Sequence, residues 1–298
     1  MKPILAFFST IMFVSLLTSC KKENNTQQPY RVATVTSYYY GFDEYYQTQV
    51  TYENNRIKST VAENEAKIEN TYAGDSVVSD HYYYTENDWS PNSRTVEKFQ
   101  GNLVQEANVF LSEDPGSLYR KVVYTYEGEK PLEINGFTSV EDALVIYDSY
   151  RYFYNADQLM KASFYFRALT DEDIVENFRR EFTYQNNLLD EEFVYTDYYG
   201  YPIQLTYKKH YSYDGKNRLS KAEYFNYQSG EFLLDAEEVF SYDDADNLVK
   251  RVKTDVAGTI FFEEELTYET GLNEYQSIYD VLAGEALKHP LPISAAGK

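Results

Sequence analysis

Aromatic and polar residues alternate with a period of two along most of the chain. Tyr124 and Tyr126 are separated by a single residue, as are Tyr152 and Tyr154, and charged or small residues stand beside them. Successive side chains of a strand point to opposite faces, so each pair of rings lies on one face. The alternation and the aromatic content together predict half-buried β-strands.

These segments belong to one phrase that recurs along the chain: aromatic-x-Tyr, a short turn, then Leu or Val and a charged strand. The clearest copy runs from Lys208 to Tyr227, and successive copies lie 20 to 30 residues apart. Each interval fits one hairpin-sized unit. The copies align on nine positions, called here the repeat aromatics: Tyr52, Tyr72, Phe99, Tyr126, Tyr154, Tyr184, Tyr213, Tyr242 and Tyr268.

Turn-forming residues follow the repeat aromatics. Residues 185–187, 214–217 and 243–247 are rich in Gly, Asn and Asp, which tolerate positive φ or hydrogen-bond to their own backbone. Each unit is therefore predicted to be strand, tight turn, strand and looser turn. The second strands of these three units are expected to begin at Leu188, Leu219 and Leu248.

Nine such units predict an all-β fold, a repetitive antiparallel meander of about 18 strands over residues 30–275. A meander of this length should form a twisted or coiled sheet, and the sequence does not decide whether its edges meet. Residues 276–298 are expected to form a C-terminal cap or tail. Apolar residues near helical spacing after Asn273, with Pro290 as a stop, predict a short C-terminal helix there.

The amino terminus has a different character. Lys2 precedes an almost uncharged apolar run over residues 4–17, which is too short to span a bilayer and is typical of a secretory signal. The ending Leu17-Thr18-Ser19-Cys20 resembles the lipobox of bacterial lipoproteins. The resemblance implies cleavage of a signal peptide, residues 1–19, and lipidation of Cys20, whose acyl chains would hold the protein to a membrane.

Residues 20–29 then form the lipidated cysteine and a flexible tether, and an outer-membrane lipoprotein on the periplasmic or cell-surface side is the expected location. Cys20 is the only cysteine in the chain, so no intrachain disulfide and no thiolate metal site can form. The chain carries 27 Lys and Arg against 48 Asp and Glu, which argues against a nucleic-acid partner. An integral outer-membrane barrel is not expected, because the non-aromatic strand faces are charged and a lipid-facing band must be apolar.

The phrase, above all YSYDGKNRLSKAEY and YNADQLMKAS, resembles the YD or RHS repeat, and more closely the YD-like repeats of Bacteroidetes lipoproteins of unknown function. The resemblance covers roughly residues 30–275 and implies a long β-sheet that winds or curls. The usual Gly-Arg-Leu is mostly replaced, and only Asn217-Arg218-Leu219 is near it. No toxin cargo domain follows, so the shell-and-toxin function of large RHS proteins is not carried over.

Catalytic and metal-binding patterns are weak. His81, His210 and His289 each stand alone in the sequence, and the chain has no metalloprotease, nucleophile-elbow or nucleotide-binding motif. The acidic turns at 171–173 and 243–247 do not fit the spacing of an EF-hand. We therefore expect no catalytic residue, no metal site and no cofactor. A solvated turn is the favoured interpretation of both acidic clusters.

Aromatic residues outside the repeat phrase are the better functional candidates. Exposed rings can stack on sugars or hold a protein partner, and we select Tyr39, Tyr83, Trp89 and Tyr199 as ligand-binding candidates. The sequence thus favours a non-enzymatic, lipid-anchored binding or scaffold protein that displays a Tyr-rich β-surface to glycans or envelope proteins. The alternative is a glycan-active enzyme or hydrolase accessory that uses paired carboxylates.

Overall fold

The fold is all-β. A computed structural model describes residues 30–39, 44–54, 56–62, 66–85, 88–101, 103–140, 143–167, 173–196 and 202–270. The predicted signal peptide, tether, C-terminal helix and residues 276–298 lie outside this part of the chain. The strands are β1 (Tyr30–Tyr39), β2 (Glu44–Glu53), β3 (Arg56–Ala62), β4 (Ala66–Ala73), β5 (Ser76–Thr85), β6 (Asp88–Gln100), β7 (Leu103–Leu111), β8 (Asp114–Glu127), β9 (Lys130–Val140), β10 (Ala143–Asn155), β11 (Gln158–Phe166), β12 (Val175–Gln185), β13 (Leu188–Thr196), β14 (Gln204–Tyr213), β15 (Leu219–Gln228), β16 (Glu231–Tyr242), β17 (Leu248–Asp255) and β18 (Ile260–Thr270).

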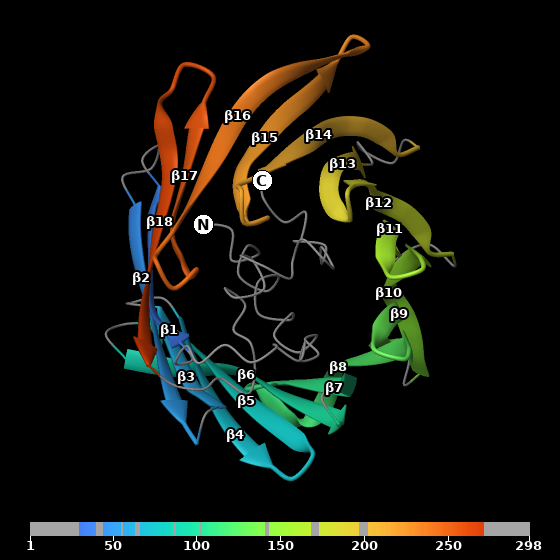
Figure 1. Cartoon of the computed structure of the whole chain (residues 1–298). Helices are drawn as coiled ribbons and strands as arrows, with labels where there is room; N and C mark the ends of the chain where they lie inside the picture. Colours follow the sequence, from blue (N-terminus) through green and yellow to red (C-terminus); the bar gives the residue numbers. More distant parts are fainter. Residues whose placement is uncertain are drawn as a thin grey trace.

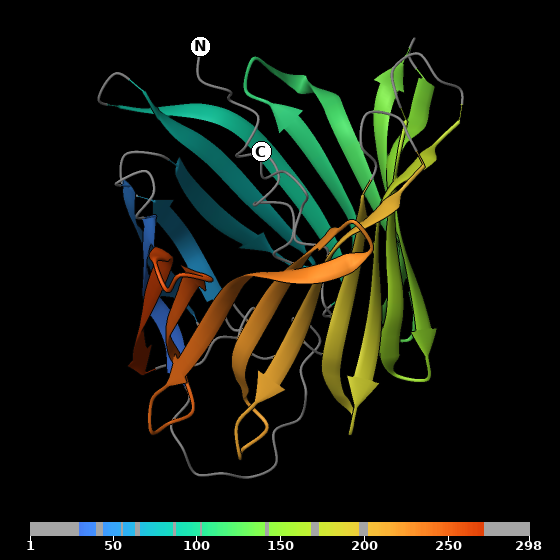
Figure 2. The same ribbon diagram turned by 90° about the horizontal axis from the view of Figure 1, so that it is seen from above.

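The 18 strands form one closed sheet. Each strand pairs in antiparallel fashion with its neighbours in the chain, and β1 pairs with both β2 and β18. Figure 1 shows the resulting ring, in which the first strand lies beside the last, and Figure 2 shows the same barrel turned by 90°. The number of strands and their antiparallel order confirm the prediction, but the open, twisted or coiled sheet is wrong: pairing between β1 and β18 closes it into a barrel.

A β-bulge recurs beside the repeat aromatics. In the β12–β13 hairpin, Tyr184 lies opposite Leu189 and Thr183 opposite Glu191, so one extra residue is inserted in β13. The same irregularity follows the repeat aromatic in six other hairpins. A bulge bends its strand and increases the local twist, and such bends help a sheet to curl and close. Two residues three apart, such as Leu189 and Glu192, consequently share one face.

The barrel closes with the geometry of the repeat itself. On β18, Tyr268 lies opposite Val32 of β1, and the register then shifts between Val32 and Thr34. The β16–β17 hairpin has the same arrangement: Leu248 lies opposite Tyr242, and the register shifts between Ser241 and Tyr242. We expected the ninth copy, at Tyr268, to continue into its own second strand. In the described barrel, the N-terminal strand β1 takes that place.

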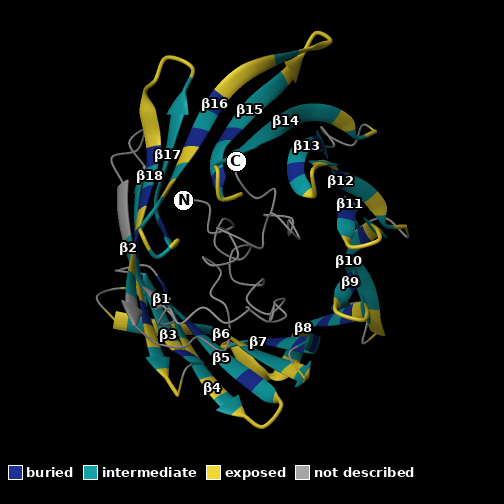
Figure 3. Ribbon diagram, viewed as in Figure 1, coloured by how far each residue is buried: buried dark blue, intermediate teal, exposed yellow. Residues whose placement is uncertain are grey.

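The buried side chains lie on the face that carries the repeat aromatics. Phe182, Leu189 and Tyr152 are buried in one cluster, and Val35, Ile57, Leu248 and Leu266 in a second. Side chains converge on the concave face of a closed single sheet and diverge on its convex face, so we place the buried face inward. Figure 3 shows that exposed residues gather in the turns and at the strand ends.

The repeat tyrosines hold neighbouring hairpins together. In six of the eight repeat tyrosines, the hydroxyl group donates to the backbone carbonyl oxygen of a residue beside the bulge of the preceding hairpin. The hydrogen-bond ladder of the sheet is interrupted at that point. Burial of the rings raises the pKa of Tyr184 and Tyr242 to about 12. The six bonds, 2.7 to 2.9 Å long, are Tyr72–Ile57, Tyr126–Val104, Tyr184–Leu159, Tyr213–Leu189, Tyr242–Leu219 and Tyr268–Leu248.

The tight turns have the predicted chemistry. Asn186 and Asn187 both have positive φ, which is the geometry of a type I′ hairpin turn. In the longer turn after Tyr242, the Asp243 carboxylate accepts the backbone N–H groups of Ala245 and Asn247 at 2.9 and 2.8 Å. The second strands begin at Leu188, Leu219 and Leu248 as expected. These turns define one end of the barrel, called here the tight-turn end; the looser connections define the opposite end, the return end.

Candidate functional site

The structure describes only some of the predicted site residues. Cys20 and Tyr199 lie outside the described residues. Tyr39 ends β1 at the return end, where its backbone lies opposite Glu44 of β2. Tyr83 and Trp89 lie at the same end, on either side of the β5–β6 connection. The end of β1 and the β5–β6 connection therefore lie at the same rim of the barrel.

Tyr83 and Trp89 belong to opposite faces of the sheet. Tyr83 lies opposite Ala66 and two residues after His81, both of which are buried on the inward face. Trp89 lies opposite Tyr84 in the β5–β6 ladder and therefore faces outward. Burial raises the pKa of Tyr83. The two candidates therefore cannot form one binding surface, although only five residues separate them.

Trp89 is instead part of an outward aromatic cluster, defined as Lys67, Tyr82, Tyr84 and Trp89. The rings of Tyr84 and Trp89 meet edge to face with centroids 5.2 Å apart. The Lys67 ammonium lies 4.3 Å from the centre of the Tyr82 ring and 5.6 Å from that of Trp89. Edge-to-face pairs and cation–π contacts fix the orientation of rings. The cluster is consequently an ordered aromatic surface at the return end.

Exposed apolar side chains also concentrate at the return end. Among the exposed large apolar residues of the described chain, only Phe153 and Val239 lie in the half of their strands nearer the tight turns. The others lie in return turns or in the adjoining halves of strands, and we call them the return rim. The return rim consists of Tyr119, Leu144, Val175, Tyr227, Leu233, Leu234, Val256, Ile260 and Phe261.

The outward wall between the two ends is covered by ion pairs. Lys121, Asn108 and Lys98 surround Glu106 and hold its pKa at about 2, so this carboxylate is ionised at neutral pH. Such a wall is not the continuous apolar band that lipid requires. The outward pairs are Arg94–Asp80, Lys98–Glu106, Lys121–Glu106, Arg151–Glu133, Arg179–Glu181, Lys208–Glu191, Lys221–Glu237 and Lys250–Glu263.

A second set of charges, which we call the inward belt, follows the inner face from β12 to β1. The Arg180 guanidinium donates to the Glu192 carboxylate, which also accepts from the Tyr211 hydroxyl at 2.6 Å. The Lys209 ammonium lies 3.4 Å from the same carboxylate. Burial alone would raise the pKa of Glu192, but Arg180, Lys209 and Tyr211 lower it to about 2. This carboxylate is therefore ionised and engaged at neutral pH.

The inward belt continues across the seam of the barrel. The Tyr224 hydroxyl donates to Glu238 at 2.5 Å, and an Arg251 nitrogen lies 3.5 Å from the other oxygen of that carboxylate. Arg251 also donates to Glu264 at 2.8 Å. On β1, the Ser37 hydroxyl donates to Glu264 at 3.1 Å. Each carboxylate of the inward belt thus contacts a cation, which leaves none of them poised as a free general acid or base.

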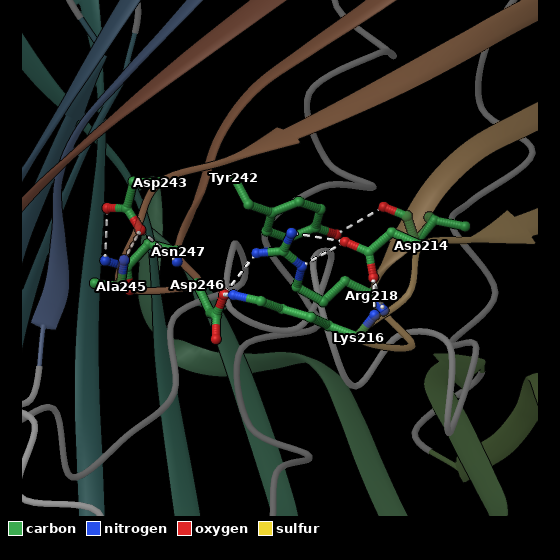
Figure 4. Close-up of polar contacts among 9 residues, drawn as sticks. Asp214, Lys216, Arg218, Tyr242, Asp243, Ala245, Asp246 and Asn247 are labelled. Carbon is green, nitrogen blue, oxygen red and sulfur yellow. Dashed lines mark hydrogen bonds and ion pairs between the residues drawn. The ribbon is translucent and has the colours of Figure 1, made fainter.

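The acidic turn at 243–247 and His210 have structural partners, whereas residues 171–172 lie outside the described residues. Figure 4 shows that Asp246 contacts Lys216 and Arg218 of the preceding turn, at 2.7 and 2.6 Å. His210 lies 3.0 Å from Glu223 on the outward wall, and burial lowers the pKa of the inward His81. Within the described residues, no group of three or more His, Cys, Asp or Glu side chains could hold a metal ion. His289 lies outside the described residues.

Comparison with known proteins gives resemblances of fold. No family model and no curated protein matches the chain. A porin-like protein from Bacteroides vulgatus shares 12% identity and a TM-score of 0.46, covering 80% of this chain and 98% of that one. A porin-like protein from Bacteroides uniformis shares 9% identity and a TM-score of 0.42, with coverage of 80% and 96%. A TcdB2–TccC3 structure shares 9% identity and a TM-score of 0.33, covering 76% of this chain and 15% of that one.

The identities and TM-scores are too low to transfer a function. In the part of the chain that the structure describes, no helix is long and apolar enough to cross a membrane.

Proposed function

We propose that this protein is a non-catalytic, lipid-anchored binding or scaffold protein of the cell envelope. Cys20 would carry the lipid, and the return rim with the outward aromatic cluster would face glycans or envelope proteins. The observation that supports this proposal is the separation of the two ends: apolar side chains are exposed at one end, and the described chain enters and leaves at the other.

The topology supports this orientation. Tyr30, the first residue of β1, lies opposite Thr270, the last residue of β18. Both are at the tight-turn end, because β1 and β18 have their other ends at return connections. A tether of residues 20–29 would therefore attach the lipid to the tight-turn end. The first and last described residues thus lie at the end opposite the return rim.

The chemistry of the surfaces supports a binding role rather than catalysis. Among the described residues, nine of the eleven exposed large apolar side chains belong to the return rim, and exposed apolar surface gathered at one end of a molecule is a candidate for binding. The wall is ion-paired, and each carboxylate of the inward belt is engaged by a cation. A paired-carboxylate hydrolase would need one carboxyl group held protonated near neutral pH. The pKa of Glu192 is about 2, and the buried Asp148, whose pKa burial raises, is paired with Arg120 at 2.7 Å.

A glycan-array screen of the chain from Lys21 onward tests the proposal, because ordered aromatic rings are suited to stacking on sugars. Trp89→Ala removes the largest ring of the outward cluster and should weaken glycan binding at least about tenfold, the equivalent of ~1.4 kcal/mol. Phe153→Ala is the control, because Phe153 is an exposed aromatic of the wall and should leave binding unchanged.

If no glycan binds, a pull-down from the cell envelope with wild type and a Leu233→Asp, Leu234→Asp double variant tests for a protein partner. A partner captured by the wild type and lost by the double variant would support the return rim as a protein-binding surface. Turnover of a glycan by the purified chain, abolished by a carboxylate substitution, would instead establish the enzymatic alternative. Equal capture by both proteins would remove the basis for assigning a function to the rim.

A further inference from the structure

Two lysines of the inward belt lie close to one aromatic ring. Lys209 of β14 lies opposite Tyr224 of β15, and Lys253 of β17 lies opposite Glu238 of β16. The Lys253 ammonium is 3.7 Å from the centre of the Tyr224 ring, and the Lys209 ammonium is 5.4 Å from it. The sheet therefore gathers two ammonium groups on the inward face of a strongly acidic chain.

The nearby carboxylates are directed toward other groups. Glu238 accepts from the Tyr224 hydroxyl and faces Arg251, while Glu192 accepts from Arg180 and Tyr211 and lies 3.4 Å from Lys209. Lys253 forms no ion pair with any described residue; its contacts are with the rings of Tyr224 and Phe261. One ammonium of the pair therefore has aromatic neighbours and lacks a direct counter-ion among the described side chains.

The electrostatics of Lys253 agree with this geometry. Burial lowers its pKa, Glu238 and Asp235 oppose that change, and the positive charges of Lys209 and Arg251 add to the lowering. A negatively charged group beside both ammonium groups would reduce their mutual repulsion and supply the missing counter-ion. The partly buried setting makes such an interaction stronger than it would be in bulk water.

We propose that Lys253 and Lys209, whose ammonium groups both lie near the Tyr224 ring, form a binding site for a small oxyanion on the inward face of the barrel. The ligand carries a carboxylate or a phosphate, and the ammonium groups bind it as two charged hydrogen-bond donors. The site does not depend on the return rim, so it can exist whether or not the rim binds a glycan or a protein.

Lysine modification with and without ligand tests the site on the purified protein. The protein is treated with a limiting amine-acetylating reagent in four arms that contain no ligand, inorganic phosphate, glucuronate or neutral glucose, and modified lysines are quantified by mass spectrometry. At a ligand concentration ten times Kd, acetylation of Lys253 should slow about tenfold. Lys250, three residues away and paired with Glu263 on the outward wall, is the internal control and should be unaffected.

Protection by phosphate and glucuronate would support a general oxyanion site, and protection by glucuronate alone would support a site for acidic sugars. Equal rates in every arm, or equal protection by glucose, would overturn the proposal.

Two substitutions separate the charge of Lys253 from its packing. Lys253→Met keeps an apolar stem but removes the ammonium, and calorimetric titration with the protecting anion should show at least about tenfold weaker binding. Lys253→Arg keeps the positive charge and should retain binding, as should the matched wall variant Lys250→Met. If Lys253→Met binds the anion like the wild type, the site is wrong. If Lys253→Met does not fold, loss of binding in Lys209→Met serves the same purpose, and retained binding there would also contradict the proposal.

Discussion

The two ends of the barrel are built in different ways. At the tight-turn end, the same arrangement recurs from hairpin to hairpin: a repeat aromatic, a turn, a bulge and a hydroxyl bond to the preceding unit. At the return end, the connections vary in length, and most of the exposed apolar side chains lie beside them. The comparison indicates that the repeated contacts between hairpins lie at one end of the barrel, while most of the exposed apolar side chains of the described residues lie at the other.

A core truncation should show the largest difference between the two ends. Phe182 is 2% exposed on the inward face near the tight turns, whereas Leu233 of the return rim is 49% exposed. Phe182→Ala should lower the free energy of unfolding by about 3–5 kcal/mol, because it opens a cavity. Leu233→Ala should change it by less than about 0.5 kcal/mol. Urea denaturation of both variants measures this, and similar losses would contradict the division between the ends.

Alkaline pH should remove the stabilisation that the buried repeat tyrosines contribute at the tight-turn end. Burial raises the pKa of Tyr184 and Tyr242 from 10.0 to about 12 in the folded protein. The folded state therefore retains protons that the unfolded state loses, so the stabilisation is complete below pH 10 and is lost as pH rises toward 12.

Tyrosinate absorbance followed together with circular dichroism measures this effect. We expect a subset of tyrosines to ionise only when the strand signal is lost. Ionisation of all tyrosines near pH 10 with the fold intact would show that the repeat rings are not buried as described.

Removal of a single tyrosine hydroxyl should change the free energy of unfolding by less, and again by different amounts at the two ends. Tyr213→Phe deletes the bond to the Leu189 carbonyl, and the net loss should be about 1 kcal/mol. Tyr227 is exposed on the return rim, and Tyr227→Phe should be close to neutral. Chemical denaturation of the two variants tests the pair, and a neutral Tyr213→Phe would mean that the hydroxyl bonds do not connect the hairpins energetically.

The smallest predicted effect concerns two alanines in turns. Ala156, in the tight turn between β10 and β11, has a φ of 52°, which costs an L-residue about 1–2 kcal/mol. Ala156→Gly should therefore raise the free energy of unfolding by about 0.5–1 kcal/mol. Ala257, in the return turn between β17 and β18, does not have positive φ. Ala257→Gly should lower the free energy of unfolding by up to about 1 kcal/mol. Thermal denaturation of the two variants should therefore show melting temperatures that shift in opposite directions.

The charges of the inward belt have a signal in the sequence. The aromatic spacing extends two residues further toward the start of the strand, where a charged residue stands four positions before the repeat aromatic in four copies: Arg180, Lys209, Glu238 and Glu264. Period two places all four on the inward face. Their pairing could not be predicted, because a partner on the next strand depends on the register and on the bulge that shifts it.

The aromatic candidates show the same limit. Tyr83 and Trp89 were selected because aromatic residues are dense around the β5–β6 connection. Trp89 pairs with Tyr84, the neighbour of Tyr83, so the two rings lie on opposite faces. Local sequence can indicate that an aromatic surface exists near a turn, but the face that each ring occupies follows from the strand pairing.

The sequence by itself determined the units of this protein. Period-two alternation requires strands, the Asn, Asp and Gly clusters require turns, and the regular spacing of the repeat aromatics requires consecutive antiparallel hairpins, since all of these are local properties of the chain. Only the tertiary structure decided that the sheet closes, because the pairing of β1 with β18 joins residues more than 200 positions apart. Closure then divided the sheet into an inward and an outward face, and this division brought the charges of β12 to β1 together in one belt.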